Sequence, residues 1–144
     1  MPNYITINVF LNKRPDMTKI LNSILMVEDE PDIQTVAKLS LESVGGFSVE
    51  ICSSGQEAIE KAPKIKPDLI LLDVMMPGMD GPTTLQELKK IPEITGTPVI
   101  FMTAKVQPQE VQQYLELGAI NVIAKPFDPM TLSDNVRDIW EKNQ

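Results

Sequence analysis

The sequence contains no histidine and only one cysteine among its 144 residues. Without histidine, the chain cannot carry a Ser-His-Asp or Cys-His nucleophile pair, a zinc site with histidine ligands, or a phosphohistidine of its own. The single cysteine, Cys52, excludes a disulfide within the chain. We expect Cys52 to be a small packing residue at a strand end rather than a reactive thiol, which suits a reducing cytoplasm.

Basic residues and long apolar runs are also scarce. Thirteen Lys and Arg stand against twenty Asp and Glu, so the net charge is −7. This balance disfavours direct nucleic-acid binding, because clustered Lys and Arg supply most of the affinity for phosphate backbones, and it favours protein or cation partners.

No apolar run approaches the ~20 residues that a membrane helix needs, and the amino terminus lacks the basic-then-apolar order of a signal peptide. We therefore expect a cytoplasmic protein without a membrane span.

Glycine motifs of nucleotide-binding folds are missing as well. The seven glycines form neither Gly-x-x-x-x-Gly-Lys nor Gly-x-Gly-x-x-Gly, which disfavours a P-loop or dinucleotide-binding fold.

The length fits one domain, and a hydrophobic content of 42% is enough for one core. Residues 1–22 fall outside the regular pattern, so we expect an N-terminal extension there, as an added strand, a docking arm or a disordered segment. The domain proper is predicted to span residues 23–144.

Three short apolar runs are the most informative feature of the chain, because each leads directly into charged residues. The runs cover residues 24–27, 69–72 and 120–124, and they lead into Glu28-Asp29, Asp73 and Lys125. Short continuous apolar runs between helix-period stretches are typical of parallel strands buried on both faces. Ligands of such sheets bind outside the carboxyl ends of the strands. The sequence therefore predicts that these acids and the lysine converge in one crevice.

Helix-period stretches separate the strands. Pro31 opens a predicted helix that ends at Gly45-Gly46, and Ser54 to Glu57 form a capping-box pattern that opens the next helix. The alternation over residues 47–51 predicts an edge strand. The remaining predicted elements are a helix carrying Leu85, Leu88 and Ile91, a strand over 98–102, a helix over 108–117, and a last helix opened by Asp128-Pro129. The apolar positions expected to be buried in the first and last helices are Ile33, Val36, Ala37, Leu41, Val44, Leu132, Val136, Ile139 and Trp140. Five alternating strand–helix units predict an α/β sandwich with right-handed crossovers.

Four motifs in this order resemble the receiver domain of bacterial two-component response regulators over residues 23–143. They are ILMVEDEP at 24–31, LILLDVMMPGMDG at 69–81, FMTA at 101–104 and KPF at 125–127. The resemblance implies a doubly wound, flavodoxin-like (βα)5 fold with a parallel five-stranded sheet in the order 2-1-3-4-5. It also implies phosphoryl transfer onto the central aspartate from a phosphohistidine on a sensor histidine kinase or a phosphotransfer protein.

The resemblance assigns roles that the chemistry of the residues supports. Asp73 is the expected phosphoacceptor, because a carboxylate can hold a phosphoryl group as an acyl phosphate. Lys125 can neutralise phosphoryl oxygens, and the resemblance implies a cis bond between it and Pro126. Thr103 offers a hydroxyl that can donate to a phosphoryl oxygen, and the small side chain of Ala104 leaves the phosphoryl group room.

The acidic residues predict a metal site. Carboxylates ~4 Å apart repel by roughly 4 kcal/mol at an effective dielectric of about 20, so Glu28, Asp29 and Asp73 together need a cation. A few oxygen ligands with room for water suit Mg²⁺ better than Ca²⁺. The resemblance implies direct ligation by Asp29, Asp73 and the main-chain carbonyl of Met75, with Glu28 acting through water. The family often has Asp at the position of Glu28.

The expected output surface is the face formed by the fourth helix, the fifth strand and the fifth helix, including Gln112, Gln113, Glu116 and Val122. Receivers commonly have Tyr or Phe at the position of Val122, so we expect a two-state change through Thr103 and residues 104–110 instead of an aromatic switch.

The sequence leaves two other functions open. A haloacid-dehalogenase-type phosphatase is disfavoured, because Met75 stands where its second Asp would be. A receiver-like scaffold that binds proteins without being phosphorylated is the remaining alternative. In the favoured interpretation the chain is a phosphoacceptor in signalling and not an enzyme that turns over an external substrate. It would be a single-domain regulator without an effector domain, or a receiver cut from a longer protein.

Overall fold

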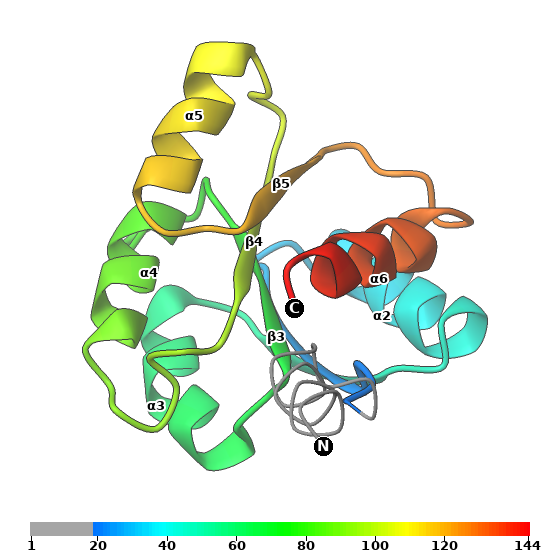
Figure 1. Cartoon of the computed structure of the whole chain (residues 1–144), viewed down its shortest axis with the longest axis horizontal. Helices are drawn as coiled ribbons and strands as arrows, with labels where there is room; N and C mark the ends of the chain where they lie inside the picture. Colours follow the sequence, from blue (N-terminus) through cyan, green and yellow to red (C-terminus); the bar gives the residue numbers. More distant parts are fainter. Residues whose placement is uncertain (1–18) are drawn as a thin grey trace, which may run out of the picture.

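A computed structural model describes residues 19–144 of the chain (Figure 1). Within these residues, five parallel strands form one sheet in the order β2-β1-β3-β4-β5, as the resemblance implied. The strands are β1 (Ser23–Val27), β2 (Ser48–Cys52), β3 (Leu69–Asp73), β4 (Val99–Thr103) and β5 (Asn121–Ala124). The inner strands β3 and β4 are buried at every position, as the apolar run at 69–72 predicted for β3. The run at 120–124 was predicted to be buried on both faces as well, but β5 lies at the edge of the sheet and only Ile123 is fully buried in it.

Helices cover both faces of the sheet (Figure 1). One face packs against α2 (Pro31–Leu39), the π-helical segment η1 (Ser40–Val44) and α6 (Leu132–Lys142), and the other face packs against α3 (Gly55–Ile65), α4 (Gly81–Lys89) and α5 (Pro108–Glu116). Each face has its own apolar cluster, and the first includes Met26 and Leu71 while the second includes Leu25 and Leu72. Because successive side chains of a strand point to opposite faces, the strands contribute to both clusters. The residues that follow the strands lie outside these clusters.

Local capping follows the sequence pattern in part. Ser54 accepts a hydrogen bond from the N–H of Glu57 at 3.1 Å, which starts α3 where it was expected. The Glu57 carboxylate accepts a hydrogen bond from the N–H of Ser53, whereas a capping box would have it accept from the N–H of Ser54. Cys52 is fully buried at the end of β2, and burial is the main cause that raises the pKa of its thiol to about 11. These values agree with a packing role for this residue.

Three further details of the prediction were wrong. The last helix begins at Leu132, because the Asp128 carboxylate accepts the N–H of Met130 and bends residues 129–131 into a turn. Val36 and Val44 are 42% and 49% exposed instead of buried. Ile91 lies beyond the end of α4, in a turn that still packs against the core.

The predicted extension lies mostly outside the described residues, because positions 1–18 are not among them. Residues 19–22 lead into β1, and the Asp68 carboxylate accepts the N–H groups of Asn22 and Ser23 at 3.0 Å each. These bonds anchor the start of β1 beside the start of β3. Between residues 19 and 144, no helix is long and apolar enough to cross a membrane.

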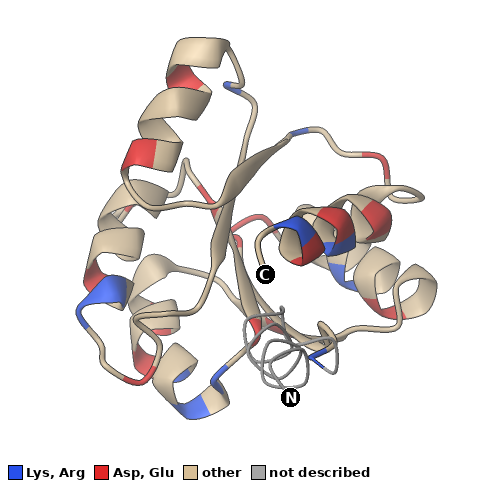
Figure 2. Ribbon diagram, in the orientation of Figure 1, with Lys and Arg blue, Asp and Glu red and all other residues tan. Residues whose placement is uncertain are grey.

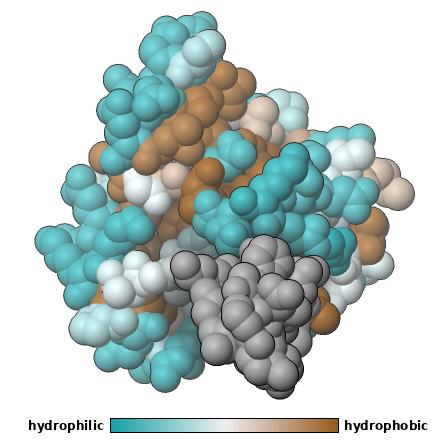
Figure 3. Space-filling model, viewed as in Figure 1, coloured by the Kyte–Doolittle hydropathy of each residue, from teal (hydrophilic) through white to brown (hydrophobic). Residues whose placement is uncertain are grey.

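Charge and hydropathy are distributed unevenly over the helices. Figure 2 shows acidic but no basic residues on α5, and its sequence contains Glu110 and Glu116 without Lys or Arg. Figure 3 shows hydrophilic groups on the outer side of α5 and a hydrophobic band on the side that turns toward the sheet. Tyr114 belongs to that inner side and packs at 5.2 Å from the ring of Phe101 in β4. The exposed side of α5 is therefore polar and acidic.

Candidate functional site

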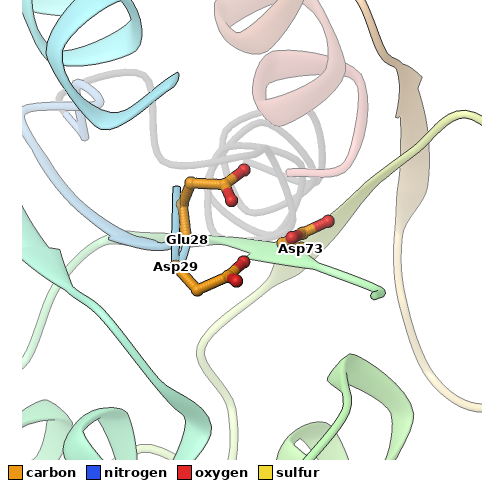
Figure 4. Close-up of side chains that lie close together, drawn as sticks. All are labelled: Glu28, Asp29 and Asp73. Atoms are coloured by element: carbon orange, nitrogen blue, oxygen red, sulfur yellow. The ribbon is translucent and has the colours of Figure 1, made fainter. Parts of the chain in front are cut away.

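The three acids predicted to converge lie together at the carboxyl ends of β1 and β3. Asp73 is the last residue of β3 and is 4% exposed, while Glu28 and Asp29 follow β1 directly. One carboxylate oxygen from each residue lies within 4.8 Å of the other two. Figure 4 shows the three side chains pointing into the same space. Because β1 and β3 are paired in parallel, Val27 beside Leu72, the residues that follow them are placed side by side.

Lys125 reaches this cluster from the end of β5. Its Nζ lies 2.8 Å from Oε1 of Glu28 and 3.2 Å from Oδ1 of Asp73. The bond between Lys125 and Pro126 is cis, and the N–H of Lys125 donates to the carbonyl of Thr103 at 2.9 Å. The backbone is thus held at β4 while the side chain extends to the acids.

Thr103 ends β4 and is 1% exposed. Its hydroxyl oxygen accepts the N–H of Lys105 at 3.0 Å, so this side chain is bonded to the loop that leads to α5. Accepting that bond leaves the hydroxyl proton free to be donated to a new acceptor.

Met75 lies two residues after Asp73, in the loop between β3 and α4, and its side chain is 66% exposed. The N–H of Gly81 donates to the carbonyl of Val74 at 2.9 Å, which closes this loop. A methyl group on Gly81 would collide with the main-chain carbonyl oxygen of Asp73, so only glycine fits here without displacing the backbone. The loop that carries Met75 is therefore held close against Asp73.

Burial and charge shift the ionisation of the site. Burial raises the pKa of Asp73 to about 6, with a further rise from the charge of Glu28 and a partial offset by Lys125. Burial alone would lower the pKa of Lys125, but its hydrogen bond to Glu28 and the charge of Asp73 raise it above its ordinary value. Lys125 is therefore charged at neutral pH, and Asp73 is ionised at some cost.

One carboxylate oxygen of Asp29 differs from the other oxygens of the cluster in its hydrogen bonding. Oδ1 of Asp29 is buried and has no hydrogen-bond partner among residues 19–144. A buried carboxylate oxygen without a donor is costly, and a bound cation would satisfy it. The donor set consists of oxygens alone, which fits Mg²⁺. The residues present therefore fit the metal that the sequence predicted.

An apolar groove beside the acids was not predicted from the sequence. It has a volume of about 450 Å³ and is lined by Asp32, Ile33, Val36, Ala104, Lys125, Pro126 and Phe127. Val36 was assigned to the core by its helical spacing, and it lines this groove instead. The neighbouring Ala37 is fully buried, so the apolar stripe of α2 is wider than the part that the core covers.

A family model for the response regulator receiver domain matches residues 24–137. The chain belongs to this family. The matched segment contains the five strands except for Ser23 at the start of β1, and it ends about halfway along α6, so the receiver fold accounts for nearly the whole described structure.

Individual relatives agree with this assignment. The chain is 37% identical over 121 residues to the alkaline phosphatase synthesis transcriptional regulatory protein PhoP of Bacillus subtilis, covering 84% of this chain and 49% of PhoP. It is 33% identical over 122 residues to response regulator Rre1 of Synechocystis, covering 85% and 53%. Its structure resembles the chemotaxis response regulator CheY4 of Vibrio cholerae, with a TM-score of 0.77, 29% identity, and coverage of 83% and 98%. The chain spans about half the length of the curated relatives it matches.

The raised pKa of Asp73 predicts a stability effect. The carboxyl group of Asp73 holds its proton more tightly in the folded protein than in the unfolded chain. The free energy of unfolding therefore falls as the pH rises from the ordinary pKa of 3.8 to the raised value of about 6. We expect Asp73→Asn to raise that free energy by about 1–2 kcal/mol at pH 7 without metal, and the gain to shrink toward pH 4. Urea unfolding at several pH values measures it.

The matched control is Glu93→Gln, which removes an acid at an exposed position. It should leave stability within about 0.5 kcal/mol at every pH. A gain for Asp73→Asn that does not change with pH, or a loss at pH 7, would contradict the account.

Proposed function

We propose that Asp73 accepts a phosphoryl group from a phosphohistidine on a sensor histidine kinase or a phosphotransfer protein, and that phosphorylation changes the binding of an output protein. The observation that carries this proposal is the placement of a buried carboxylate within 3.2 Å of a lysine amine and beside Asp29, whose Oδ1 has no hydrogen-bond partner among the described residues. Membership in the receiver family supports it.

The chemistry needs an ionised Asp73. One of its oxygens attacks the phosphorus, the phosphorus–nitrogen bond to the donor imidazole breaks, and the electron pair of that bond returns to the imidazole nitrogen. Lys125 lies 3.2 Å from Oδ1 of Asp73, so its ammonium group is placed to neutralise charge on the phosphoryl oxygens. The same ammonium favours the ionised form of Asp73 before transfer.

Magnesium is the cofactor that we propose for this site. Asp29, Asp73 and the main-chain carbonyl of Met75 would hold the ion, and Mg²⁺ would supply positive charge for the transferring phosphoryl group. Oδ1 of Asp29 is buried and has no partner within residues 19–144, which supports this assignment. Glu28 completes the acidic cluster, and both of its oxygens already have partners in the protein.

Thr103 would connect phosphorylation to the output. Its hydroxyl can keep the N–H of Lys105 as a donor while giving its own proton to a phosphoryl oxygen. A shift of Thr103 toward the phosphate would then move the loop before α5. The output surface would be the face of α5, β5 and α6, on which Gln112, Gln113 and Glu116 are exposed and Val122 is partly exposed.

The remaining proposals concern context. We propose that residues 23–144 form the receiver domain and residues 1–22 an extension, that the protein is cytoplasmic, and that the domain binds no nucleic acid itself. The domain would promote its own phosphorylation without turning over an external substrate. The net charge of −7 supports the absence of nucleic-acid binding. The bonds that the Asp68 carboxylate accepts from Asn22 and Ser23 support a domain that starts near residue 23.

Phosphorylation by a small donor tests the function. Incubation with acetyl phosphate and Mg²⁺ should add the mass of one phosphoryl group, because Asp73 and Lys125 are already in place, and chelation of the metal should prevent the addition. Asp73→Asn should abolish the mass gain, whereas the exposed Asp134→Asn should keep it. Unmodified wild-type protein at high acetyl phosphate would favour the phosphorylation-independent scaffold.

The apolar groove beside Asp73 is proposed as the contact for the donor protein, because it adjoins the acceptor and exposes Val36 on α2. With a histidine kinase that phosphorylates the wild type, Val36→Glu should slow transfer tenfold or more, while phosphorylation by acetyl phosphate should stay unchanged. Leu39→Glu is the control, since Leu39 is 64% exposed on the same helix and does not line the groove. Equal slowing by both variants, or of both donors, would refute this contact.

A further inference from the structure

A second groove, the β5–α6 groove, runs along the seam between β5 and α6. Its larger part has a volume of about 340 Å³, and a smaller part of about 220 Å³ shares Asp138 and Ile139 with it. Within residues 19–144, β5 is the last strand of the sheet, so no further strand covers this side. Residues that line the larger part include Val122, Phe127, Ile139, Asp128, Asn135 and Asp138. The groove is therefore open to a partner on the proposed output surface.

The β5–α6 groove combines apolar and acidic residues. Val122, Phe127 and Ile139 are partly buried and pack against the two apolar clusters of the core. Asp128 and Asp138 are exposed. A volume of about 340 Å³ lies at the low end of the range for small-molecule pockets, which is about 300–1,000 Å³. The groove therefore suits one or two side chains of a partner protein.

Residues 106–144 contain six acids and three basic residues, and each basic residue already has a contact. Lys125 lies in the acidic cluster, and Arg137 donates to the carbonyl of Gly45 at 2.7 Å. Lys142 pairs with Asp138 at 3.0 Å. The acids are Glu110, Glu116, Asp128, Asp134, Asp138 and Glu141. Figure 2 shows acidic bands on α5, on the segment before α6 and on α6 itself, so the face formed by α5, β5 and α6 is negative.

The ion pair of Asp138 and Lys142 leaves Asp138 accessible to another cation. The two side chains are 60% and 76% exposed, and exposed pairs contribute less than about 1 kcal/mol. A basic side chain of a partner can therefore replace Lys142 beside Asp138. A second copy of this chain would instead place acids against acids on this face, and like charges in contact oppose binding.

We propose that the β5–α6 groove binds a segment of the output protein in which an apolar side chain stands next to Lys or Arg. The apolar side chain contacts Phe127 and Ile139, and the basic side chain pairs with Asp128 or Asp138. The inference rests on the proposed function, because it takes this face as the output surface. Pro126 and Phe127 line both this groove and the groove beside Asp73, so the bound segment contacts the loop that directly follows Lys125.

Titration of ¹⁵N-labelled protein with the peptide acetyl-Gly-Arg-Leu-Arg-Leu-Arg-Gly-amide tests the groove. It is run on the unmodified protein and on the protein with beryllofluoride and Mg²⁺, a mimic of the phosphorylated state. Amide shifts should gather at Asn135, Asp138 and Ile139. Glu in place of each Arg should weaken binding about tenfold or more, and so should Ser in place of each Leu. Equal binding of the three peptides, shifts elsewhere, or no binding in either state at millimolar peptide would overturn the inference.

Two substitutions on α6 separate the groove from the general charge of the helix. Asn135→Lys places a positive charge in the groove at an exposed position and should weaken the arginine peptide about tenfold or more. Glu141→Lys is the control, since it changes the charge by more, at an exposed position that lines neither part of the groove. It should weaken binding by less than about threefold at physiological salt. Equal weakening by both variants would mean that only the overall charge matters.

The inference and the proposed function fail in different ways. If the peptide binds in the groove but acetyl phosphate does not modify Asp73, the proposed function fails and the groove stands as a docking site. If Asp73 is phosphorylated but the peptide does not bind, the groove alone is refuted. A wild-type dimer in sedimentation that Asn135→Lys converts to a monomer would also overturn the inference, because the occupant would then be a second copy of the chain.

Discussion

The ammonium group of Lys125 between Glu28 and Asp73 is the interaction on which the rest of the site depends. It brings one positive charge to a cluster of three carboxylates that lie within 4.8 Å of one another. Without it, Glu28 and Asp73 would be buried as unpaired charges, and an unpaired buried charge destabilises a fold by several kcal/mol. With it, the site keeps a surplus of two negative charges, and this surplus is what makes the cluster suitable for a divalent cation.

The parallel sheet is what makes that interaction possible. Each participating residue follows a strand, and the strands are fixed in register by their paired backbones and by apolar side chains on both faces. Charged groups from sequence positions almost a hundred residues apart therefore meet with little freedom to move. The packing of the core thus offsets the unfavourable energy of bringing like charges together.

Much of this could be predicted from the sequence, because the apolar runs and the charges that follow them are local patterns. The convergence of Glu28, Asp29, Asp73 and Lys125 followed from one rule about parallel strands. The start of α6 was not predictable in the same way, because the turn at Asp128 depends on one side-chain bond that competes with the helix. The groove at Val36 was missed because helical spacing shows which residues are apolar and not how far the core extends over them.

The pKa of Asp73, followed by ¹³C NMR of its carboxyl carbon with and without Mg²⁺, tests the central claim most directly. Burial and the neighbouring Glu28 place this pKa at about 6 in the metal-free protein. The account predicts that value without metal and a fall to well below it when Mg²⁺ is bound. An ordinary value near 3.8 without metal, or a pKa that Mg²⁺ does not move, would contradict it.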